Sequence, residues 1–251
     1  MWLKNINISG LYVHRRLWYR GHGDSSYFLH PGVYREEFTK CTNKMYGKGH
    51  KEKRLNLERE MLNDFRSSGA TLLGTDDKVQ LYFLGQHYGI PTRLLDWTTN
   101  PLAALFFAVR SERNRDKDGD FFMMDALELL TRPPKNIKPQ IFSSRNSYVT
   151  DDINVSFWSN STGAEPRIVP IMPESRFGRI IQQSSCFTLH MYLSPDCHNS
   201  TLRRIKVPKK HKPAIRNELR RLNINELSIF NDLDHLSTSI MHDWGLQSHR
   251  H

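Results

Sequence analysis

The spacing of apolar residues along the chain predicts a strand followed by helices. Leu11–Arg20 is rich in residues that favour strands. Leu57–Ser67 and Asp77–Tyr88 carry their apolar residues at helical spacing, and the second pattern ends at Gly89-Ile90-Pro91. The charged segment Glu36–Arg59 lacks a clear period at its start, so we interpret it as a loop that enters the first of these helices.

A specific start signal predicts the next helix. Asn100 is a good helix cap, because its side chain accepts hydrogen bonds from backbone N–H groups that have no partner in the first turn. Pro101 suits the first helical position, where a missing N–H costs nothing. Leu102–Val109 is apolar nearly all round, and we therefore expect a buried helix.

The second half of the chain is richer in strand patterns. Helices are predicted over Lys212–Leu222 and Asp232–Trp244, and the candidate strands are Asp120–Leu127, Arg167–Met172, Gly178–Leu193, Thr201–Val207 and Glu226–Phe230. The fold class is therefore α+β. We expect residues 1–251 to form a single domain, whose helix-rich N-terminal half packs on a mostly antiparallel, split sheet from the C-terminal half.

Composition narrows the class of protein. The chain has 251 residues, 36 Lys and Arg against 26 Asp and Glu, a net charge of +10, and 38% hydrophobic residues, which exclude global disorder. No run approaches the roughly 18 apolar residues of a membrane span, and the first residues lack the apolar core of a signal peptide. We therefore expect no membrane partner. Three cysteines make an odd, sparse set, so we expect a cytoplasmic protein without disulfides.

No metal site is predicted. Cys186, His190, Cys197 and His198 fall close together, but their spacing is not that of a pair of zinc half-sites. Strand and loop positions are the better explanation for these residues.

Basic residues concentrate late in the chain, where nine cations lie between residues 203 and 221. This density suits a nucleic-acid backbone, and we expect a nucleic-acid partner, with RNA ahead of DNA. The alternative is a solvated basic face, because no aromatic RNA-binding motif or zinc finger accompanies the run. The predicted contacts are Arg203, Arg204, Lys206, Lys209, Lys210, Arg216, Arg220 and Arg221.

A polar block precedes the Asn100 helix. It places many hydrogen-bonding groups at a predicted helix–loop–helix junction, and the helix N-terminus that follows is suited to bind an anion. We therefore predict a pocket for a phosphate-bearing ligand. The alternative is a buried Arg93–Asp96 pair that clamps two helices. The polar residues of the block are Gln86, His87, Tyr88, Thr92, Arg93, Asp96, Trp97, Thr98 and Thr99.

The same block carries a family resemblance. Trp18-Tyr19-Arg20-Gly21-His22, with Tyr19 in place of the signature Phe, and the run from Gln86 to Thr98 (QHYGIPTRLLDWT) resemble the FRG domain. The resemblance spans about residues 11–240. It implies the setting of microbial toxins and defence effectors, with an antitoxin protein as a further partner.

A second, more remote resemblance is to ADP-ribosyltransferases. Arg20-Gly21 at a strand end resembles their first motif, where an arginine holds NAD; the run from Thr98 to Ala108 (TTNPLAALFFA) resembles the second, and Glu226 is the candidate for the third. The resemblance implies an NAD-dependent transferase with an ADP-ribosyltransferase-like fold. It acts on a macromolecular target, for which we expect RNA.

Roles follow from that resemblance. The predicted catalytic residues are Glu226, which stabilises positive charge on the ribose, His87, which accepts a proton, and Arg20, which holds the pyrophosphate. If the late strand is misassigned, Asp96 or Gln182 takes the role of Glu226. The predicted cofactor-binding residues are Arg20, Gly21, Tyr88, Thr92, Arg93, Asp96, Trp97, Thr98, Thr99 and Gln182.

Two other functions remain open at this point. One is a metal-independent ribonuclease that uses Arg20, His22, His87 and Arg93 for acid–base cleavage. The other is a non-catalytic domain that binds nucleic acid or a nucleotide. The transferase hypothesis makes a spatial demand, because Arg20, Thr98 and Glu226 must then line one cleft.

Overall fold

A seven-stranded sheet forms the centre of the fold. The computed structural model describes residues 17–49, 53–129, 140–147, 149–151, 153, 167–173, 184–191, 202–230, 237 and 240. The strand order is β4-β5-β6-β2-β1-β3-β7, and all neighbours are antiparallel except β4 and β5. The strands are β1 Leu17–His22, β2 Leu94–Thr98, β3 Gly119–Asp125, β4 Phe142–Ser143, β5 Arg167–Met172, β6 Ser185–Met191 and β7 Arg203–Val207.

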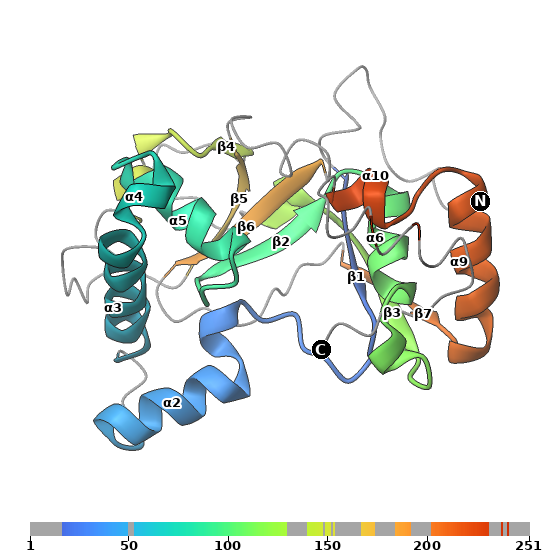
Figure 1. The fold of residues 1–251 in the computed structure, drawn as a ribbon, viewed down its shortest axis with the longest axis horizontal. Coiled ribbons are helices and arrows are strands. Elements are labelled where there is room, and N and C mark those ends of the chain that lie inside the picture. Colours follow the sequence, from blue (N-terminus) through green and yellow to red (C-terminus); the bar gives the residue numbers. More distant parts are fainter. Residues whose placement is uncertain are drawn as a thin grey trace.

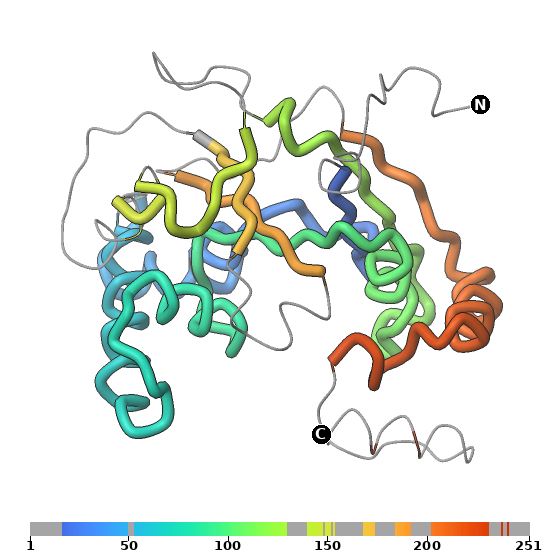
Figure 2. The backbone as a smooth tube through the Cα atoms, turned by 90° about the horizontal axis from the view of Figure 1, so that it is seen from above, coloured from blue at the N-terminus to red at the C-terminus, as the bar shows by residue number. Residues whose placement is uncertain are grey.

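Helices cover the sheet in two groups. In Figure 1, α3, α4 and α5 lie towards one end of the sheet, α6, α9 and α10 lie towards the other, and α2 extends below. The view from above separates α3 from α9 in the same way (Figure 2). The helices are α2 Glu36–Tyr46, α3 Lys53–Ser68, α4 Ala70–Leu73, α5 Lys78–His87, α6 Pro101–Val109, α9 Lys212–Arg221 and α10 Glu226–Phe230, with 3₁₀ turns η2 Gly32–Tyr34, η3 Glu112–Asn114, η4 Ala126–Leu129 and η5 Lys209–His211. The predicted α+β class with a mostly antiparallel sheet is confirmed.

The sheet is weakly joined at its middle. In the described part of the chain, β1 and β2 are paired through Tyr19 and Thr98 alone, whereas β1 pairs with β3 along its whole length and β2 does so with β6. The two central strands therefore part after one residue pair. The sheet consists of two well-bonded halves, β4-β5-β6-β2 and β1-β3-β7, and the space between the parting strands must be filled by side chains.

Each half has its own apolar core. In one, α3 and α5 pack through residues such as Leu62 and Tyr82 against Leu94 and Leu189 of the β2–β6 half. In the other, α6 packs against α9 and α10 through Phe106 and Leu219. Among the helices described, none is long and apolar enough to cross a membrane.

Three predicted elements are wrong. Glu36–Tyr46 is helix α2, not a loop, because Phe38 and Thr42 are buried on one face while the rest of the segment is solvated. Leu94–Thr98 is strand β2, not a loop, and pairing with β6 and β1 decides its conformation. Glu226–Phe230 is helix α10, not a strand.

The start of α10 has a local cause. Asn225 accepts a hydrogen bond from the Ser228 backbone N–H at 2.9 Å, and the Ser228 hydroxyl accepts one from the Asn225 backbone N–H at 2.9 Å. This reciprocal arrangement is that of a capping box. Residues 11–16, Gln182 and nearly all of the predicted helix Asp232–Trp244 lie outside the described residues.

Candidate active site

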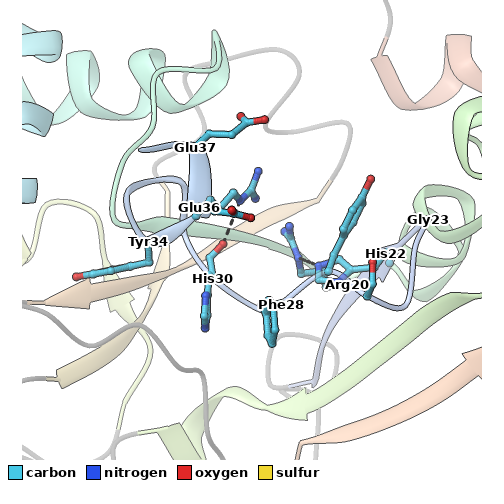
Figure 3. A pocket seen from close by; sticks show the side chains of 12 residues that line it. Arg20, His22, Gly23, Phe28, His30, Tyr34, Glu36 and Glu37 are labelled. Carbon is cyan, nitrogen blue, oxygen red and sulfur yellow. Dashed lines mark hydrogen bonds between the residues drawn. The ribbon is translucent and has the colours of Figure 1, made fainter. Parts of the chain in front are cut away.

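A cavity of about 790 Å³ opens where β1 leaves the sheet. This volume lies within the range of about 300–1,000 Å³ that is usual for small-molecule sites. Its lining combines cations and aromatic rings with the carboxylates of Glu36 and Glu37, and Figure 3 shows these side chains around one hollow. Among the lining residues are Arg20, Gly21, His22, Gly23, Ser26, Tyr27, Phe28, His30, Tyr34, Arg35, Glu36 and Glu37.

Arg20 bridges the gap between the two parting strands. Its Nη1 donates a hydrogen bond to the backbone carbonyl of Asp96 on β2, and its Nε donates to Nε2 of His22 at 2.9 Å. The Asp96 carboxylate lies 3.9 Å from the same Nη1. The guanidinium is thus held from two sides at the mouth of the cavity, and its side chain is only 16% exposed.

His22 is a neutral histidine at the base of the site. It is 5% exposed, and its pKa is lowered from 6.5 to about 3, chiefly by burial and then by the positive charge of Arg20; Arg35 and Arg204 add to the shift, and the backbone of Tyr27 opposes it. Because Nε2 accepts from Arg20, the ring proton is assigned to Nδ1. Arginines from three separate segments therefore act on His22 with their positive charge.

Gly21 lets β1 and α6 approach each other. A Cβ built on Gly21 would lie 1.9 Å from the carbonyl oxygen of Ala104 and 2.6 Å from the backbone nitrogen of Ala108. The N-terminus of α6 is capped as predicted, since the Asn100 side chain accepts from the N–H groups of Leu102 and Ala103 at 2.9 and 3.4 Å. Only glycine fits at position 21, and that contact fixes the direction in which Arg20 leaves the strand.

A chain of hydrogen bonds orients Asp96. The Gln86 amide donates to Oδ2 of Asp96 at 3.0 Å and accepts from the Thr92 hydroxyl at 2.6 Å. Thr92 in turn accepts from the backbone N–H of Leu94 at 3.0 Å. The Asp96 side chain is 52% exposed, so an oriented carboxylate stands in solvent beside Arg20.

Arg93 belongs to the core and not to the cavity. It is 2% exposed, and its Nε donates to Oε2 of Glu58 at 2.9 Å. The other oxygen of Glu58 accepts from the Tyr82 hydroxyl at 2.5 Å and from the Arg93 backbone N–H at 2.9 Å. The clamp that the sequence allowed is therefore real, but its acid is Glu58 on α3 and not Asp96. The prediction that Arg93 binds a phosphate does not fit this buried position.

Several other predicted ligands are also structural. Trp97 is 2% exposed, and its Nε1 donates to the Thr188 hydroxyl at 3.1 Å, so its ring does not stack on a ligand. Thr92 is fully buried, and the Thr98 hydroxyl, on a residue that is 5% exposed, accepts from the Asn100 backbone N–H at 3.0 Å. The Thr99 backbone N–H bonds to the Ser184 carbonyl at 3.1 Å, which ties β2 to the start of β6.

His87 and Tyr88 lie at the end of α5. Their rings meet edge to face at 5.1 Å, and the ring of Tyr88, a residue that is 68% exposed, lies 6.3 Å from that of Phe65 on α3. The described ring contacts of Tyr88 are thus with α5 and α3, and neither His87 nor Tyr88 is among the residues that line the cavity.

Glu226 begins α10 and not a strand. Its described electrostatic neighbour is Arg110, which follows α6: burial lowers the pKa of this arginine, and the charge of Glu226 opposes the shift. Arg110 also lies 4.4 Å from the ring centre of Phe230. This arrangement fastens α10 to α6. The strand predicted at Glu226 is wrong, and the demand that Arg20, Thr98 and Glu226 line one cleft is not met, because Arg20 lines the cavity and neither Thr98 nor Glu226 does. Asp96, one of the two substitutes that the sequence named for Glu226, is the carboxylate that lies beside Arg20.

The basic cluster is partly neutralised by tertiary contacts. Arg204 and Asp120 are 2.7 Å apart, Lys206 and Asp118 are 2.9 Å apart, and Arg221 and Glu218 are 2.9 Å apart. A fourth pair joins Arg216 to Glu112. Arg203, Lys209 and Lys210 are exposed, and Arg220 is half-buried. Four of the eight predicted nucleic-acid contacts thus have an acidic partner; Arg221 has one three residues away on its own helix, and the other three have partners that the local sequence did not reveal.

No group of three metal-ligating side chains gathers among the residues that the structure describes. Cys186 is buried in the apolar core beside Trp97, and the hydroxyl of Thr188 lies 3.0 Å from Nε2 of His190. Cys197 and His198 lie outside the described residues.

Comparison with known families identifies part of the chain. Residues 15–117 match the family model of the FRG domain, a span that contains Arg20, Gly21 and the block from Gln86 to Thr98. No curated protein and no solved structure matches the chain.

Proposed function

Since residues 15–117 match the FRG domain, we propose that the cavity at Arg20 binds NAD and that the protein transfers ADP-ribose from NAD to a macromolecule, RNA being the preferred target. One observation carries the proposal: Arg20 stands where two central strands part, with the oriented carboxylate of Asp96 beside it. Arg20 lies within β1 and not at its end as the sequence predicted, but an arginine on a strand next to a carboxylate still resembles the arrangement of ADP-ribosyltransferases.

The lining of the cavity fits a dinucleotide. Arg20, Arg35 and Arg204 each contribute positive charge at His22, and a pyrophosphate is well matched to guanidinium groups. The volume is sufficient for a nucleotide-sized ligand.

The reaction requires little more than charge placement. The bond from the ribose C1′ to the nicotinamide nitrogen breaks, and its electron pair leaves with the nicotinamide. A nucleophile of the target forms the new bond to C1′, and its proton passes to a base. Arg20 holds the pyrophosphate, and Asp96 supplies the negative charge that stabilises a developing positive charge on the ribose. Gln86 keeps the Asp96 carboxylate in place.

Labelled NAD and total RNA test the proposal directly. Transfer of label to RNA is expected for the unaltered protein and is expected to fall at least 100-fold in Arg20→Lys and Asp96→Asn, since removal of one charge-stabilising group costs about that much. Asp96→Asn keeps an acceptor for the Gln86 amide, so the loss would be chemical and not structural. Glu226→Gln is the control and is expected to stay active. Loss of transfer in Glu226→Gln with full activity in Asp96→Asn would overturn the assignment.

The same experiment separates the other functions. RNA shortening without NAD would favour the ribonuclease, and stabilisation by NAD without transfer would favour a binding domain. The geometry supports the ribonuclease less, because His22 is neutral with its acceptor nitrogen occupied by Arg20, and Arg93 is held in the core by Glu58. We place the transferase in the cytoplasm as a toxin or defence effector, with an antitoxin as a further partner.

A further inference from the structure

The loop from Gly23 to Pro31 carries an exposed aromatic platform at the mouth of the cavity. Phe28 is 77% exposed and its ring lies nearly parallel to that of His30, with ring centres 5.3 Å apart and an angle of 17° between planes. Both side chains project to the same side of the loop in Figure 3. Tyr27 is 52% exposed. The Phe28 side chain is thus left mostly in solvent.

Cations from two other segments are fastened to the same loop. Arg35, which precedes α2, donates from Nε to the carbonyl of His30 at 3.4 Å. Arg204 of β7 donates from Nη2 to the carbonyl of Ser25 at 2.7 Å. The basic edge strand, which the sequence separates from Arg20 by more than 180 residues, is therefore joined to the loop that lines the cavity.

The sheet register explains why they meet. Arg20 is opposite Phe122 on β3, and Phe122 is opposite Arg204 on β7, so the two arginines stand in one row across three strands. Neighbouring strands are about 4.8 Å apart, which places the two backbones about 10 Å from each other. The Arg204 guanidinium lies 5.9 Å from the ring centre of Phe122. Beyond it, Arg203 and Lys206 are exposed along the edge of the sheet.

We propose that the loop 23–31 and strand β7 form a binding surface for single-stranded nucleic acid. An unpaired base stacks on the Phe28–His30 platform, and flanking phosphates meet Arg35 and the basic residues of β7. Stacking on aromatic side chains with a cationic groove alongside is how proteins hold single strands, whereas a base inside a duplex is not accessible to such a platform. The inference deepens the proposed function, because the bound strand would stand at the entrance to the Arg20 cavity.

Stacking is expected to contribute more than charge. Asp120 and Asp118 are paired with Arg204 and Lys206, so part of the basic edge is already neutralised. A binding surface of this kind favours single strands over other polyanions. An acidic protein, which would use the cations alone, is the less favoured partner.

Fluorescence anisotropy with a labelled 12-nucleotide RNA tests the surface in the full-length protein. Phe28→Ala is expected to weaken binding about 10-fold or more, in line with the loss of one base–aromatic stack. Phe28→Trp is expected to retain binding. Leu72→Ala on α4 is the matched control, because Leu72 is an equally exposed apolar residue (88%) on another element, and it is expected to bind as the unaltered protein does. Thermal unfolding of each variant checks that the fold is intact.

Three results would overturn the inference: unchanged affinity in Phe28→Ala, equal affinity for a duplex of the same sequence, or equal competition by polyglutamate. The binding measurement contains no NAD, so it fails or succeeds separately from the transferase proposal. RNA binding that depends on Phe28 in a protein without label transfer would refute the transferase and leave the surface. Label transfer to protein, with no affinity for RNA, would refute the binding surface and leave the transferase.

Discussion

Gly21 lies directly against Ala104, and the two backbones touch where β1 crosses α6. A side chain at position 21 would overlap the Ala104 carbonyl, with 1.9 Å between the built Cβ and the oxygen. The residue before it, Arg20, points into the gap between β1 and β2 and is held there by Asp96 and His22. The two residues of the Arg-Gly signature thus have separate roles: the glycine seats the strand on the helix, and the arginine faces the cavity.

Gly21→Ala is expected to destabilise the protein by about 3 kcal/mol or more, above the usual 1–3 kcal/mol of overpacking, because the colliding atoms are backbone atoms that cannot rotate away. Urea unfolding measures this. Gly23→Ala is the control, since its Cβ would meet chiefly the side-chain amide of Asn114 at 2.9 Å, which can move. Equal stability of the two variants would contradict the account of the signature glycine.

The buried pair of Arg93 and Glu58 predicts a non-additive response. Glu58→Ala leaves a buried guanidinium without its acid and is expected to cost about 3–5 kcal/mol, whereas a pair replaced as a whole costs much less. We expect Glu58→Leu with Arg93→Met to be markedly more stable than Glu58→Ala. Chemical denaturation of Glu58→Ala, Arg93→Met, the double variant and the unaltered protein decides the point, and a double variant no more stable than Glu58→Ala would show that the pair does not act as a unit.

His22 predicts a pH dependence of stability. Burial, and then the charge of Arg20, lower the pKa of His22 from 6.5 to about 3, so the unfolded chain takes up a proton below pH 6.5 that the folded chain does not take up until about pH 3. The contribution of His22 to the free energy of unfolding is therefore complete above pH 6.5 and is lost as the pH falls towards 3. Between pH 7 and pH 5 this loss is about 2 kcal/mol.

The matched variant for this prediction is His22→Gln, which keeps an acceptor for Arg20 but does not titrate. Its free energy of unfolding is expected to fall less between the two pH values, and the difference between the proteins isolates His22. A parallel fall in both proteins would assign the pH dependence to other groups.

The cap of α6 predicts a smaller effect. Asn100→Ala removes the acceptor of the Leu102 and Ala103 N–H groups and is expected to cost about 1 kcal/mol. Asn100→Asp keeps the acceptor and adds a negative charge at a helix N-terminus, so its stability is expected to match or exceed that of the unaltered protein. Thermal unfolding of both variants provides the comparison, and a loss in Asn100→Asp equal to that in Asn100→Ala would exclude capping as the cause.

Much of the local structure could be predicted. The helices α3, α5, α6 and α9 follow from apolar spacing and from caps such as Asn100, and β5 has its predicted bounds. The α10 error shows a signal that was available, because Asn225 and Ser228 have the spacing of a reciprocal cap. Strand β2 gave no such signal, since it is short and its conformation depends on partners on both sides.

The candidate site could be predicted only in part. Arg20 and Asp96 were both named and lie side by side, but Arg93, Trp97 and Thr98 proved to be buried, and the predicted grouping of Arg20, Thr98 and Glu226 was wrong. A motif marks which residues matter without telling whether they contact a ligand or hold the residues that do. The platform of Phe28 and His30 was missed because exposure of an aromatic residue is a property of the folded surface.

By itself, the sequence determined the local elements, the α+β class and the segment around Arg20, because propensity, capping and periodicity act between residues a few positions apart. Only the tertiary structure decided that Arg93 pairs with Glu58, 35 residues earlier, and that Arg204 reaches the loop beside the cavity. The physical reason is that ion pairs and strand registers between distant segments depend on the packing of the whole chain. The surplus of positive charge is accordingly divided between core pairs, the cavity and the edge of the sheet.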